Sequence, residues 1–410
     1  MKKFSEYTYE DYVNDKNIFY VEPMTCKEGD ICDLPTYAKE KWVAQEKFDG
    51  HRAIMFLSTN GTRIFSRTDS KKTGWKTENT DKLPHLRDIL VKKHHLHRWF
   101  NGCVFDGELV AASGKFKDVQ SITGALEDKA IEFQEKNGYA EYVVFDILQY
   151  RYNDVRSYPY YQRFKMLVAV VEHLKKICPD VKIRIAPIYC SLSTQDELIE
   201  IMKQCPSVSK YVNVVYGETN PFKYLLGNFW GDGKEGLILK NILAPYEHKR
   251  SSQCLKFKEH KTFDVVITGY KPPTREYTGK TLKEKGYWNY WEKVEYNGRL
   301  VTTTQGEISR EQAEMEGYEP VTKPYFLGWV GAITCGLYKD GELVDIVEVK
   351  GITDADQEFI KKNRERLIGT CIEITAQEVI DPEKKSLRHP RFSRWRTDDK
   401  DPLTCTWDSF

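Results

Sequence analysis

Gln45-Glu46-Lys47-Phe48-Asp49-Gly50-His51-Arg52 is the stretch from which the organisation of this 410-residue chain can be worked out. A lysine amine becomes a nucleophile toward phosphorus when burial or nearby cations lower its pKa. Asp49 is a candidate ligand for a metal or a hydroxyl, and Arg52 is a candidate partner for oxygen atoms. The same residues also fit an exposed turn, so the stretch alone leaves both interpretations open.

The composition is that of a folded protein, with 40% hydrophobic and 30% charged residues, and the length allows two or three domains. No apolar run is long enough to span a membrane, and the first residues lack the apolar core of a signal peptide. We therefore expect an intracellular protein with no membrane partner. The ten cysteines form no zinc-type cluster, which favours reduced thiols. With a net charge of +1, a partner rich in phosphate must be bound by local basic patches.

The residues after the opening stretch predict a β-hairpin. An apolar run over 53–57 leads into Asn60-Gly61, and a second run follows over 63–67. Lys47 then lies at the mouth of an antiparallel sheet, and Arg67 lies at the end of the return strand, near Lys71 and Lys72. This basic cluster fits a solvated loop as well as an anion site.

Four later strands carry residues suited to chemistry. Glu108 lies within an apolar run, where a carboxylate costs free energy unless it is paired or bound to metal. Phe145 fits either plain core or a platform for stacking a base. Glu235 leads an apolar strand, and Lys256 and Lys258 point the same way from theirs, so they can converge on one anion. The four predicted strands cover residues 103–110, 142–148, 235–240 and 254–258.

The remaining pattern predicts the domain organisation. Residues 1–40 are too few for an independent domain and should pack on the domain that begins after them. Helical periodicity covers 84–100, 160–178 and 194–204, with a strand at 183–189. After residue 261, short strands at even spacing predict a small β-barrel. We therefore place a domain boundary there, giving domains of 1–261 and 262–410. Residues 271–325 are long for a barrel connection and form an elaboration, and residues 384–396 form the densest basic patch.

In this order the motifs resemble those of the ATP-dependent DNA ligases, within the covalent nucleotidyltransferases that also include RNA ligases and mRNA capping enzymes. The resemblance covers roughly residues 42–401. The motifs are the lysine stretch, Ser66-Arg67, Asp106-Gly107-Glu108, Phe145-Asp146, Glu235-Gly236, Lys256-Phe257-Lys258 and a basic segment from Ser386 to Lys400. The resemblance implies an α+β fold, in which an adenylation (nucleotidyltransferase) domain of antiparallel sheets with flanking helices precedes an OB-fold β-barrel.

The resemblance also implies an activity. It implies a polynucleotide ligase that seals 5′-phosphate/3′-hydroxyl nicks in duplex DNA, through lysyl-AMP and DNA-adenylate intermediates, in DNA replication, repair and recombination. The implied cofactors are ATP and Mg²⁺ (or Mn²⁺), the partner is nicked duplex DNA, and we expect a monomer. Phosphoryl transfer of this kind depends mainly on positioning and on charge neutralisation.

Individual roles follow from matching motif residues. Lys47 is implied as the nucleophile and Phe145 as the adenine platform, while Arg52 and Glu108 hold the ribose. The implied metal ligands are Asp49, Glu108 and Glu235. The other residues implied in nucleotide or phosphate binding are Gln45, Glu46, Arg67 (toward the 5′-phosphate of the nick), Lys256, Lys258, Arg394 and Arg396.

Two departures from the family pattern concern the C-terminal motif. His389 stands where an aromatic residue is common, and the ending Arg396-Thr397-Asp398-Asp399-Lys400 is one residue longer than usual. Which of Arg394, Arg396 and Lys400 orients pyrophosphate therefore stays open.

Several alternatives remain at the level of sequence. An RNA ligase or a GTP-dependent capping enzyme of the same superfamily is the alternative activity, and an OB-fold binder with a degenerate transferase domain is the non-enzymatic one. The 46 residues before Lys47 are too few for a large helical DNA-binding domain, which indicates a compact viral or phage-type ligase. Residues 271–325 either clamp DNA or enclose a small aromatic core. Their relevant side chains are Lys280, Lys283, Lys285, Tyr287, Trp288, Tyr290 and Trp291.

Overall fold

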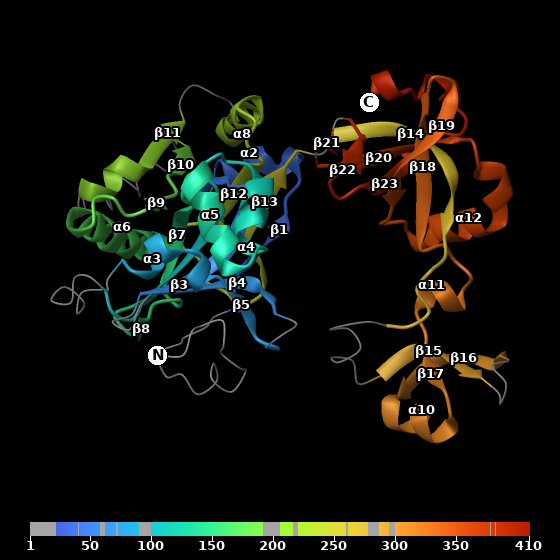
Figure 1. Ribbon diagram of the computed structural model, residues 1–410, viewed down its shortest axis with the longest axis horizontal. Helices are drawn as coiled ribbons and strands as arrows, with labels where there is room; N and C mark the ends of the chain where they lie inside the picture. The colour runs from blue at the N-terminus through green and yellow to red at the C-terminus, as the bar shows by residue number, and fades with distance from the viewer. Residues whose placement is uncertain are drawn as a thin grey trace. The chain divides into compact units, whose positions relative to one another are not determined.

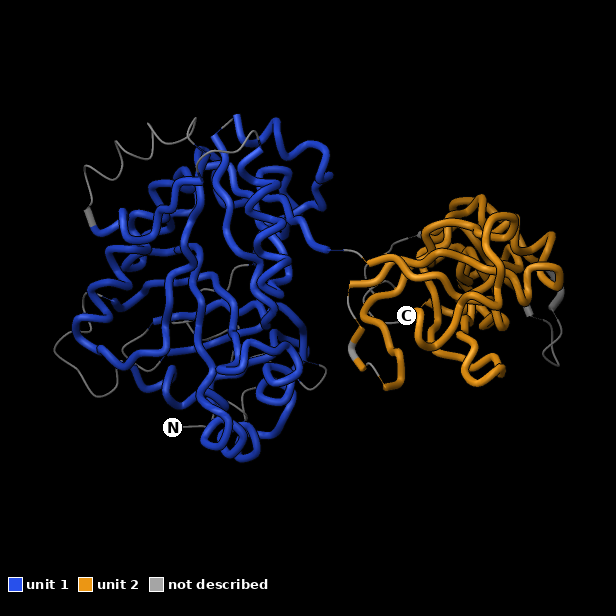
Figure 2. The backbone as a smooth tube through the Cα atoms, turned by 90° about the horizontal axis from the view of Figure 1, so that it is seen from above, with its two compact units in different colours: residues 1–259 blue, residues 260–410 orange. Residues whose placement is uncertain are grey.

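The computed structural model describes residues 22–39, 41–57, 62–70, 73–89, 100–191, 206–215, 220–259, 261–277, 287–294, 300–377, 379–381 and 383–410. The chain divides into two compact units, residues 1–259 and 260–410 (Figure 2). The helix expected over 194–204 lies outside the described residues. Of the helix expected over 84–100, the described part forms the short helix α3 (Pro84–Arg87).

Unit 1 contains two sheets (Figure 1). The first has the strand order β1–β13–β12–β2–β10–β11, and the second has the order β5–β4–β3–β6–β7–β8, with β9 beside β7. The strands are β1 (Thr25–Glu28), β2 (Trp42–Lys47), β3 (His51–Leu57), β4 (Arg63–Asp69), β5 (Lys76–Glu78), β6 (Cys103–Val110), β7 (Glu141–Tyr150), β8 (Asn153–Asp154), β9 (Ile183–Ile185), β10 (Ile188–Ser191), β11 (Val212–Val215), β12 (Gly236–Asn241) and β13 (Arg250–Lys258).

Most of the described strand pairs in these two sheets are antiparallel, as predicted, and three are parallel. The pairs β1–β13, β10–β11 and β7–β9 are parallel. Between β7 and β9 the chain makes the crossover that parallel strands require, through helix α6 (Tyr160–Ile177). The strand expected over 183–189 is split into β9 and β10, which belong to different sheets. Pro187 lies between them and has no N–H to donate to a ladder.

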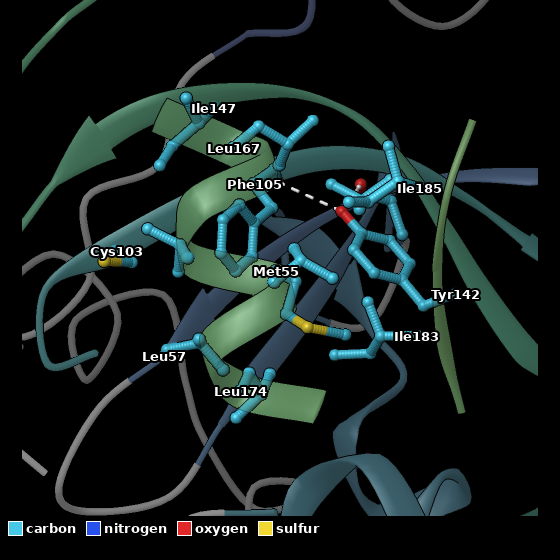
Figure 3. Packing of buried hydrophobic residues seen from close by; sticks show 14 of the residues in the cluster. Met55, Leu57, Cys103, Phe105, Tyr142, Ile147, Leu167, Leu174, Ile183 and Ile185 are labelled. Carbon is cyan, nitrogen blue, oxygen red and sulfur yellow. Dashed lines mark hydrogen bonds between the residues drawn. The ribbon is translucent and has the colours of Figure 1, made fainter. Parts of the chain in front are cut away.

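Side chains along the strands of the second sheet point alternately to its two faces. Met55, Phe105 and Tyr142 face α6 and form one buried core with its Leu167 and Leu174 (Figure 3). The hydroxyl of Tyr142 donates to the carbonyl oxygens of Ala53 at 2.9 Å and Phe105 at 3.1 Å. The other described helices of unit 1 are α2 (Leu34–Tyr37), α4 (Phe116–Thr123), α5 (Glu127–Asn137) and α8 (Pro221–Gly231).

The first sheet is covered on its outer face by α8 and α2. Leu237 and Leu239 of β12, with Leu255 and Phe257 of β13, pack against residues such as Phe222 of α8. The inner faces of the two sheets meet in another cluster, which joins Ile54, Phe65 and Val104 of the second sheet to Cys254 and Ile238 of the first. Polar residues two positions away on these same strands share the inner faces and therefore face each other between the sheets.

Unit 2 contains a five-stranded antiparallel sheet of order β19–β18–β14–β20–β23. The two edge strands also meet: Lys350, directly after β19, forms a parallel bridge with Arg391 of β23. Helix α12 (Asp354–Leu367) lies between β19 and β20 in the chain, and Ile360 and Leu367 pack into the core. The strands are β14 (Lys261–Lys271), β18 (Ala332–Lys339), β19 (Glu342–Val349), β20 (Cys371–Ala376) and β23 (Arg391–Trp395), with a small ladder of β21 (Val379–Asp381) and β22 (Ser386–Leu387).

The segment between β14 and β18 has a small core of its own. Trp288 and Trp291 are 3% and 0% exposed and pack with Ala313. Buried aromatic rings of this kind cannot stack on a base. The three lysines expected to contact DNA lie outside the described residues. The elements here are β15 (Tyr287–Val294), β16 (Leu300–Ser309), α10 (Arg310–Glu316), β17 (Glu319–Pro320) and α11 (Lys323–Phe326).

Candidate active site

A cavity of about 510 Å³ opens between the two sheets of unit 1. Its volume is in the range of sites that hold small molecules or nucleotides. The first sheet contributes Gln45, Lys47, Ile238, Lys240 and Lys256 to its wall, and the second contributes Arg52, Arg67, Asp106, Glu108 and Phe145. The cavity is therefore rich in cations, and aromatic rings and carboxylates line the same wall.

Lys47 ends β2 at the mouth of the cavity. Its ammonium forms an ion pair with the Glu235 carboxylate, because Gly236, the residue after Glu235, pairs with Lys47 across the β2–β12 ladder. Gly50 begins the return toward β3, and a Cβ there would lie 2.2 Å from the carbonyl oxygen of Leu109. Any larger residue at position 50 would therefore move the backbone beside Lys47.

Arg52 is held by a buried network. Its Nε donates to Asp106 at 2.6 Å, and one terminal nitrogen donates to the carbonyl oxygen of Met24 at 3.1 Å. The Tyr246 hydroxyl donates to the other oxygen of Asp106 at 2.6 Å and accepts from the Met24 N–H at 2.8 Å. Burial alone would lower the pKa of Arg52, but the Asp106 carboxylate outweighs burial and raises that pKa well above its usual value.

The ring of Phe145 lies close to two cations. The Arg52 guanidinium is 4.7 Å from its ring centre, and the Lys240 ammonium is 4.5 Å from the same centre. The register of β6 and β7 shifts at this point, since Asp106 pairs with Asp146 and Gly107 pairs with Val144. Phe145 is thus an extra residue on β7, and bulges of this kind re-aim a side chain. Burial lowers the pKa of Lys240.

Glu108 shares the inner face of β6 with Asp106. Burial raises the pKa of Glu108 to about 8, although the charges of Arg52 and Lys47 act in the opposite direction. Asp106 and Glu235 add to the increase. The carboxyl group is therefore largely protonated at neutral pH, and an added cation would favour its ionised form.

The other predicted residues lie around the cavity. Gln45 is buried and donates to the carbonyl oxygen of Ala186 at 3.1 Å. Glu46 pairs with Lys234 at 3.0 Å, and Lys256 pairs with Glu28 at 3.5 Å. The side chain of Arg67 is exposed at the rim.

Three predicted residues of unit 1 are not part of the wall of the cavity: Asp49, Glu235 and Lys258. Lys258 lies two residues after Lys256 on the same face of β13, and burial, followed by the charge of Lys256, lowers its pKa. Asp49 is half-buried in the turn between β2 and β3.

Arg394 and Arg396 belong to unit 2 and are engaged there. Arg394 donates to Glu373 at 3.1 Å. Arg396 donates to Asp399 at 2.9 Å and to Asp264 at 3.1 Å, and Lys400 lies 3.4 Å from Asp264. Arg396 and Lys400 therefore share one acidic partner.

Sequence reasoning did not single out several residues of the cavity. Lys240 stands at the end of an apolar strand, and its two-residue spacing from Ile238 was the available signal. Asp106 belongs to the same motif as Glu108, but the sequence alone assigned it no role. For Tyr246 and Met24 there was no signal, because they reach Arg52 from parts of the chain more than 20 residues away in either direction.

The carboxylates near Lys47 are suited to a divalent metal ion that also contacts substrate phosphates. Among the described residues, no three or more His, Cys, Asp or Glu side chains lie together as a ready-made metal site. Mg²⁺ is commonly held by one or two carboxylates together with phosphate oxygens of a substrate. Glu235 and Glu108, close to Lys47, fit that requirement.

Comparison with known proteins identifies the family. The family model described as "ATP dependent DNA ligase domain" matches residues 23–258. This chain belongs to the ATP-dependent DNA ligase family. The match extends over more than half of the chain and includes every wall of the cavity.

Relatives of this ligase-family chain are distant. The SPbeta prophage-derived DNA ligase-like protein LigB of Bacillus subtilis is 24% identical over 56% of this chain and 66% of its own length. The DNA ligase of Haemophilus influenzae is 24% identical over 62% of this chain and 72% of its own. The matched region thus spans about two thirds of these relatives.

Solved structures support the fold. A structure from a study of Lig E DNA ligases covers 92% of this chain and 100% of its own, with a TM-score of 0.53 and 15% identity. The structure titled "Pmar-Lig_PreS3" covers 92% of this chain and 68% of its own, with a TM-score of 0.54 and 18% identity. None of the helices in the described part of the chain is long and apolar enough to cross a membrane.

Proposed function

We propose that this member of the ligase family seals 5′-phosphate/3′-hydroxyl nicks in duplex DNA and uses ATP to do so. The observation that carries the proposal is the cavity in which Lys47, an aromatic ring and several cations converge between the two sheets. A nucleophilic amine among cations is the arrangement that transfer of a nucleotidyl group from ATP requires.

In the first step, the Lys47 Nζ forms a bond to the α-phosphorus of ATP. The bond from that phosphorus to the bridging oxygen breaks, and pyrophosphate leaves with the electron pair. Lys47 must lose a proton before it attacks, and Glu235 is the carboxylate in contact with its ammonium. Lys256 and Lys258, on one face of β13, would balance the charge on the α-phosphate.

The base and the ribose would be held deeper in the cavity. Phe145 would stack on adenine, and the Arg52 and Lys240 cations near its ring centre would keep the ring in place. Arg52 and Glu108 would bind the ribose hydroxyls, with Gln45 and Glu46 completing the nucleotide site. Mg²⁺ (or Mn²⁺), when bound, neutralises phosphate oxygens, and Glu235, Glu108 and Asp49 are the carboxylates that would hold it.

The second and third steps act on DNA. An oxygen of the 5′-phosphate at the nick attacks the lysyl-linked phosphorus, and the electron pair of the P–N bond returns to Lys47, which regains a proton. The 3′-hydroxyl then attacks the 5′-phosphorus and AMP leaves. Arg67, exposed at the rim of the cavity, would contact the 5′-phosphate.

For unit 2 we propose an OB-fold that binds the duplex. Its strand order, the bridge between its edge strands and the helix before β20 support this assignment. Residues 1–261 would then be the adenylation domain. Arg394 and Arg396 would orient pyrophosphate, residues 271–325 would clamp DNA through their surface around a structural aromatic core, and the enzyme would act as a monomer.

The test is incubation of the pure protein with magnesium and α-labelled ATP, in parallel with α-labelled GTP, followed by a denaturing gel. We expect label from ATP on the protein, transfer of that label to nicked duplex DNA, and no label on Lys47→Ala. Lys249→Ala, which removes a surface lysine with a 73% exposed side chain, is the matched control and should label normally.

Other outcomes would overturn the proposal. Label from GTP instead of ATP would indicate a capping-type enzyme. Label that remains in Lys47→Ala would place the nucleophile elsewhere, and absence of label in folded protein would leave a nucleic-acid binder.

A further inference from the structure

Two cysteines form part of the wall of the cavity, and the ligase mechanism uses neither. Cys26 lies on β1 and Cys254 on β13, and both face the cavity. The β1–β13 ladder shifts register here, because Cys26 pairs with Ser251 and Lys27 pairs with Leu255. Cys254 is thus one of three residues of β13 that bulge out beside Cys26, and the two thiols are hydrogen-bonded to each other.

The cations of the cavity make the two thiols unequal. The hydrogen bond from Cys254 lowers the pKa of Cys26 to about 7, and the charges of Arg52, Lys240 and Lys47 act in the same direction. The same hydrogen bond, together with burial, raises the pKa of Cys254 well above its usual value. Cys26 therefore carries much thiolate at neutral pH, while Cys254 remains a protonated donor.

Other cysteines provide contrasts within the same chain. Cys32 is exposed, but a hydrogen bond to Asp30 raises its pKa. The Sγ atoms of Cys371 and Cys405 lie 3.4 Å apart, but these residues are 0% and 1% exposed in the core of unit 2. Cys26, half-buried on the wall of an open cavity, combines access with a cationic environment.

We propose that Cys26 is a modification site for peroxides and small electrophiles inside the cavity, and that Cys254 is its resolving partner. The Cys26 thiolate attacks one oxygen of hydrogen peroxide, which breaks the O–O bond and gives a sulfenic acid and, after proton transfer, water. The Cys254 thiol then attacks the sulfenic sulfur, and a second water leaves as the disulfide forms. Two thiols are oxidised by two electrons, and one peroxide is reduced to two waters.

This proposal rests on the proposed function in one respect: if the cavity holds ATP, a bound nucleotide shields Cys26. Oxidation would then act on the enzyme when its cavity is empty and would spare the occupied form.

The first experiment measures alkylation of each cysteine in the full chain by iodoacetamide, with peptide mass mapping. At pH 7 about half of Cys26 is thiolate, against less than about one per cent for a thiol with a pKa above 9. Since nucleophilicity falls as pKa falls, the net advantage of Cys26 over Cys32 should be at least about 5-fold. The rate at Cys26 should rise with a midpoint near pH 7.

Variants of Cys254 test whether its hydrogen bond, and not the packing of its side chain, sets the reactivity of Cys26. Cys254→Ala removes the hydrogen-bond donor and should move the Cys26 midpoint to higher pH. Cys254→Ser keeps a donor and should leave the midpoint close to the wild-type value. A midpoint that is the same in both variants, or slower alkylation of Cys26 than of Cys32 in wild type, would overturn the proposal.

The second experiment uses hydrogen peroxide. We expect a Cys26–Cys254 disulfide, absent from Cys26→Ser, to form faster than any disulfide between Cys371 and Cys405. Faster oxidation of the buried pair would overturn the proposal. Millimolar ATP should slow alkylation of Cys26. If Cys26 reacts as expected but ATP gives no protection, the thiol site stands and the assignment of the cavity to ATP fails.

Discussion

Replacing Arg163 with alanine should destabilise unit 1 strongly, because it removes the cationic partner of a buried carboxylate. Asp146 follows Phe145 on β7, lies on the cavity wall, and is 1% exposed. Arg163, on α6, is also 1% exposed, and its Nε and a terminal nitrogen donate to the two oxygens of Asp146 at 2.8 and 3.0 Å. The other terminal nitrogen donates to the carbonyl oxygen of Ala244 at 3.1 Å.

Breaking a buried pair by removing one partner costs about 3 to 5 kcal/mol. For a unit of this size, each kcal/mol lowers Tm by about 2 to 4 °C, so the expected drop is roughly 6 to 20 °C. Arg184→Ala is the matched control. Arg184 donates to Glu141, also on β7, at the same 2.8 Å, but these side chains are 40% and 35% exposed. Its loss should cost at most about 1 kcal/mol.

The assay is scanning calorimetry of the full chain at pH 7. We expect the Tm of one transition to be lower in Arg163→Ala than in wild type. The double variant Arg163→Ala/Asp146→Ala should recover part of that loss, since it no longer contains an unpaired charge. If Arg163→Ala and Arg184→Ala had the same Tm, the reasoning from burial would be refuted.

Three further predictions concern other parts of the chain. Phe145→Leu should keep the bulk but lose the aromatic face, and so weaken ATP binding about 5- to 30-fold, on the basis of about 1 to 2 kcal/mol for the lost ring contacts; calorimetric titration measures this, and unchanged affinity would contradict a stacking role. Trp291→Ala removes a 0% exposed ring from the core of the segment between β14 and β18 and should destabilise that segment by about 3 to 5 kcal/mol. Amide hydrogen exchange should become faster in the segment between β14 and β18, while labelling of Lys47 by ATP persists. Burial lowers the pKa of His85 below 6.5, so the unfolded chain takes up a proton that the folded chain excludes; stability should therefore fall as pH drops below 6.5 and level off below the folded-state pKa. Between pH 7.5 and 5.5, the free energy of urea unfolding should decrease less for His85→Gln than for wild type. Equal decreases would exclude His85 as the source of the pH dependence.

Local patterns predicted the strands that carry the candidate site. The period of two along β6 and β13 is visible in the sequence, and the structure confirms that Leu255 and Phe257 pack into a core on the face opposite Lys256. The same reasoning predicted α6 close to its observed bounds. It did not predict α12, whose face toward the core is limited to a few residues such as Ile360 and Leu367. It merged β9 and β10 into one strand, because two short apolar runs around Pro187 give a single pattern.

The family resemblance, the order of the motifs and the sheet faces on which their side chains lie can all be inferred from the sequence, because strand alternation depends only on neighbouring residues. Which faces meet depends on the tertiary structure. Packing the two sheets against each other places Lys240 against the ring of Phe145 and brings Tyr246 and Met24 to the network of Arg52. It also sets the thiol of Cys26 beside that of Cys254 among the cations of the cavity. These contacts join residues up to 228 positions apart, as for Cys26 and Cys254 (254 − 26), and their burial and charge effects exist only after the sheets exclude water from between them.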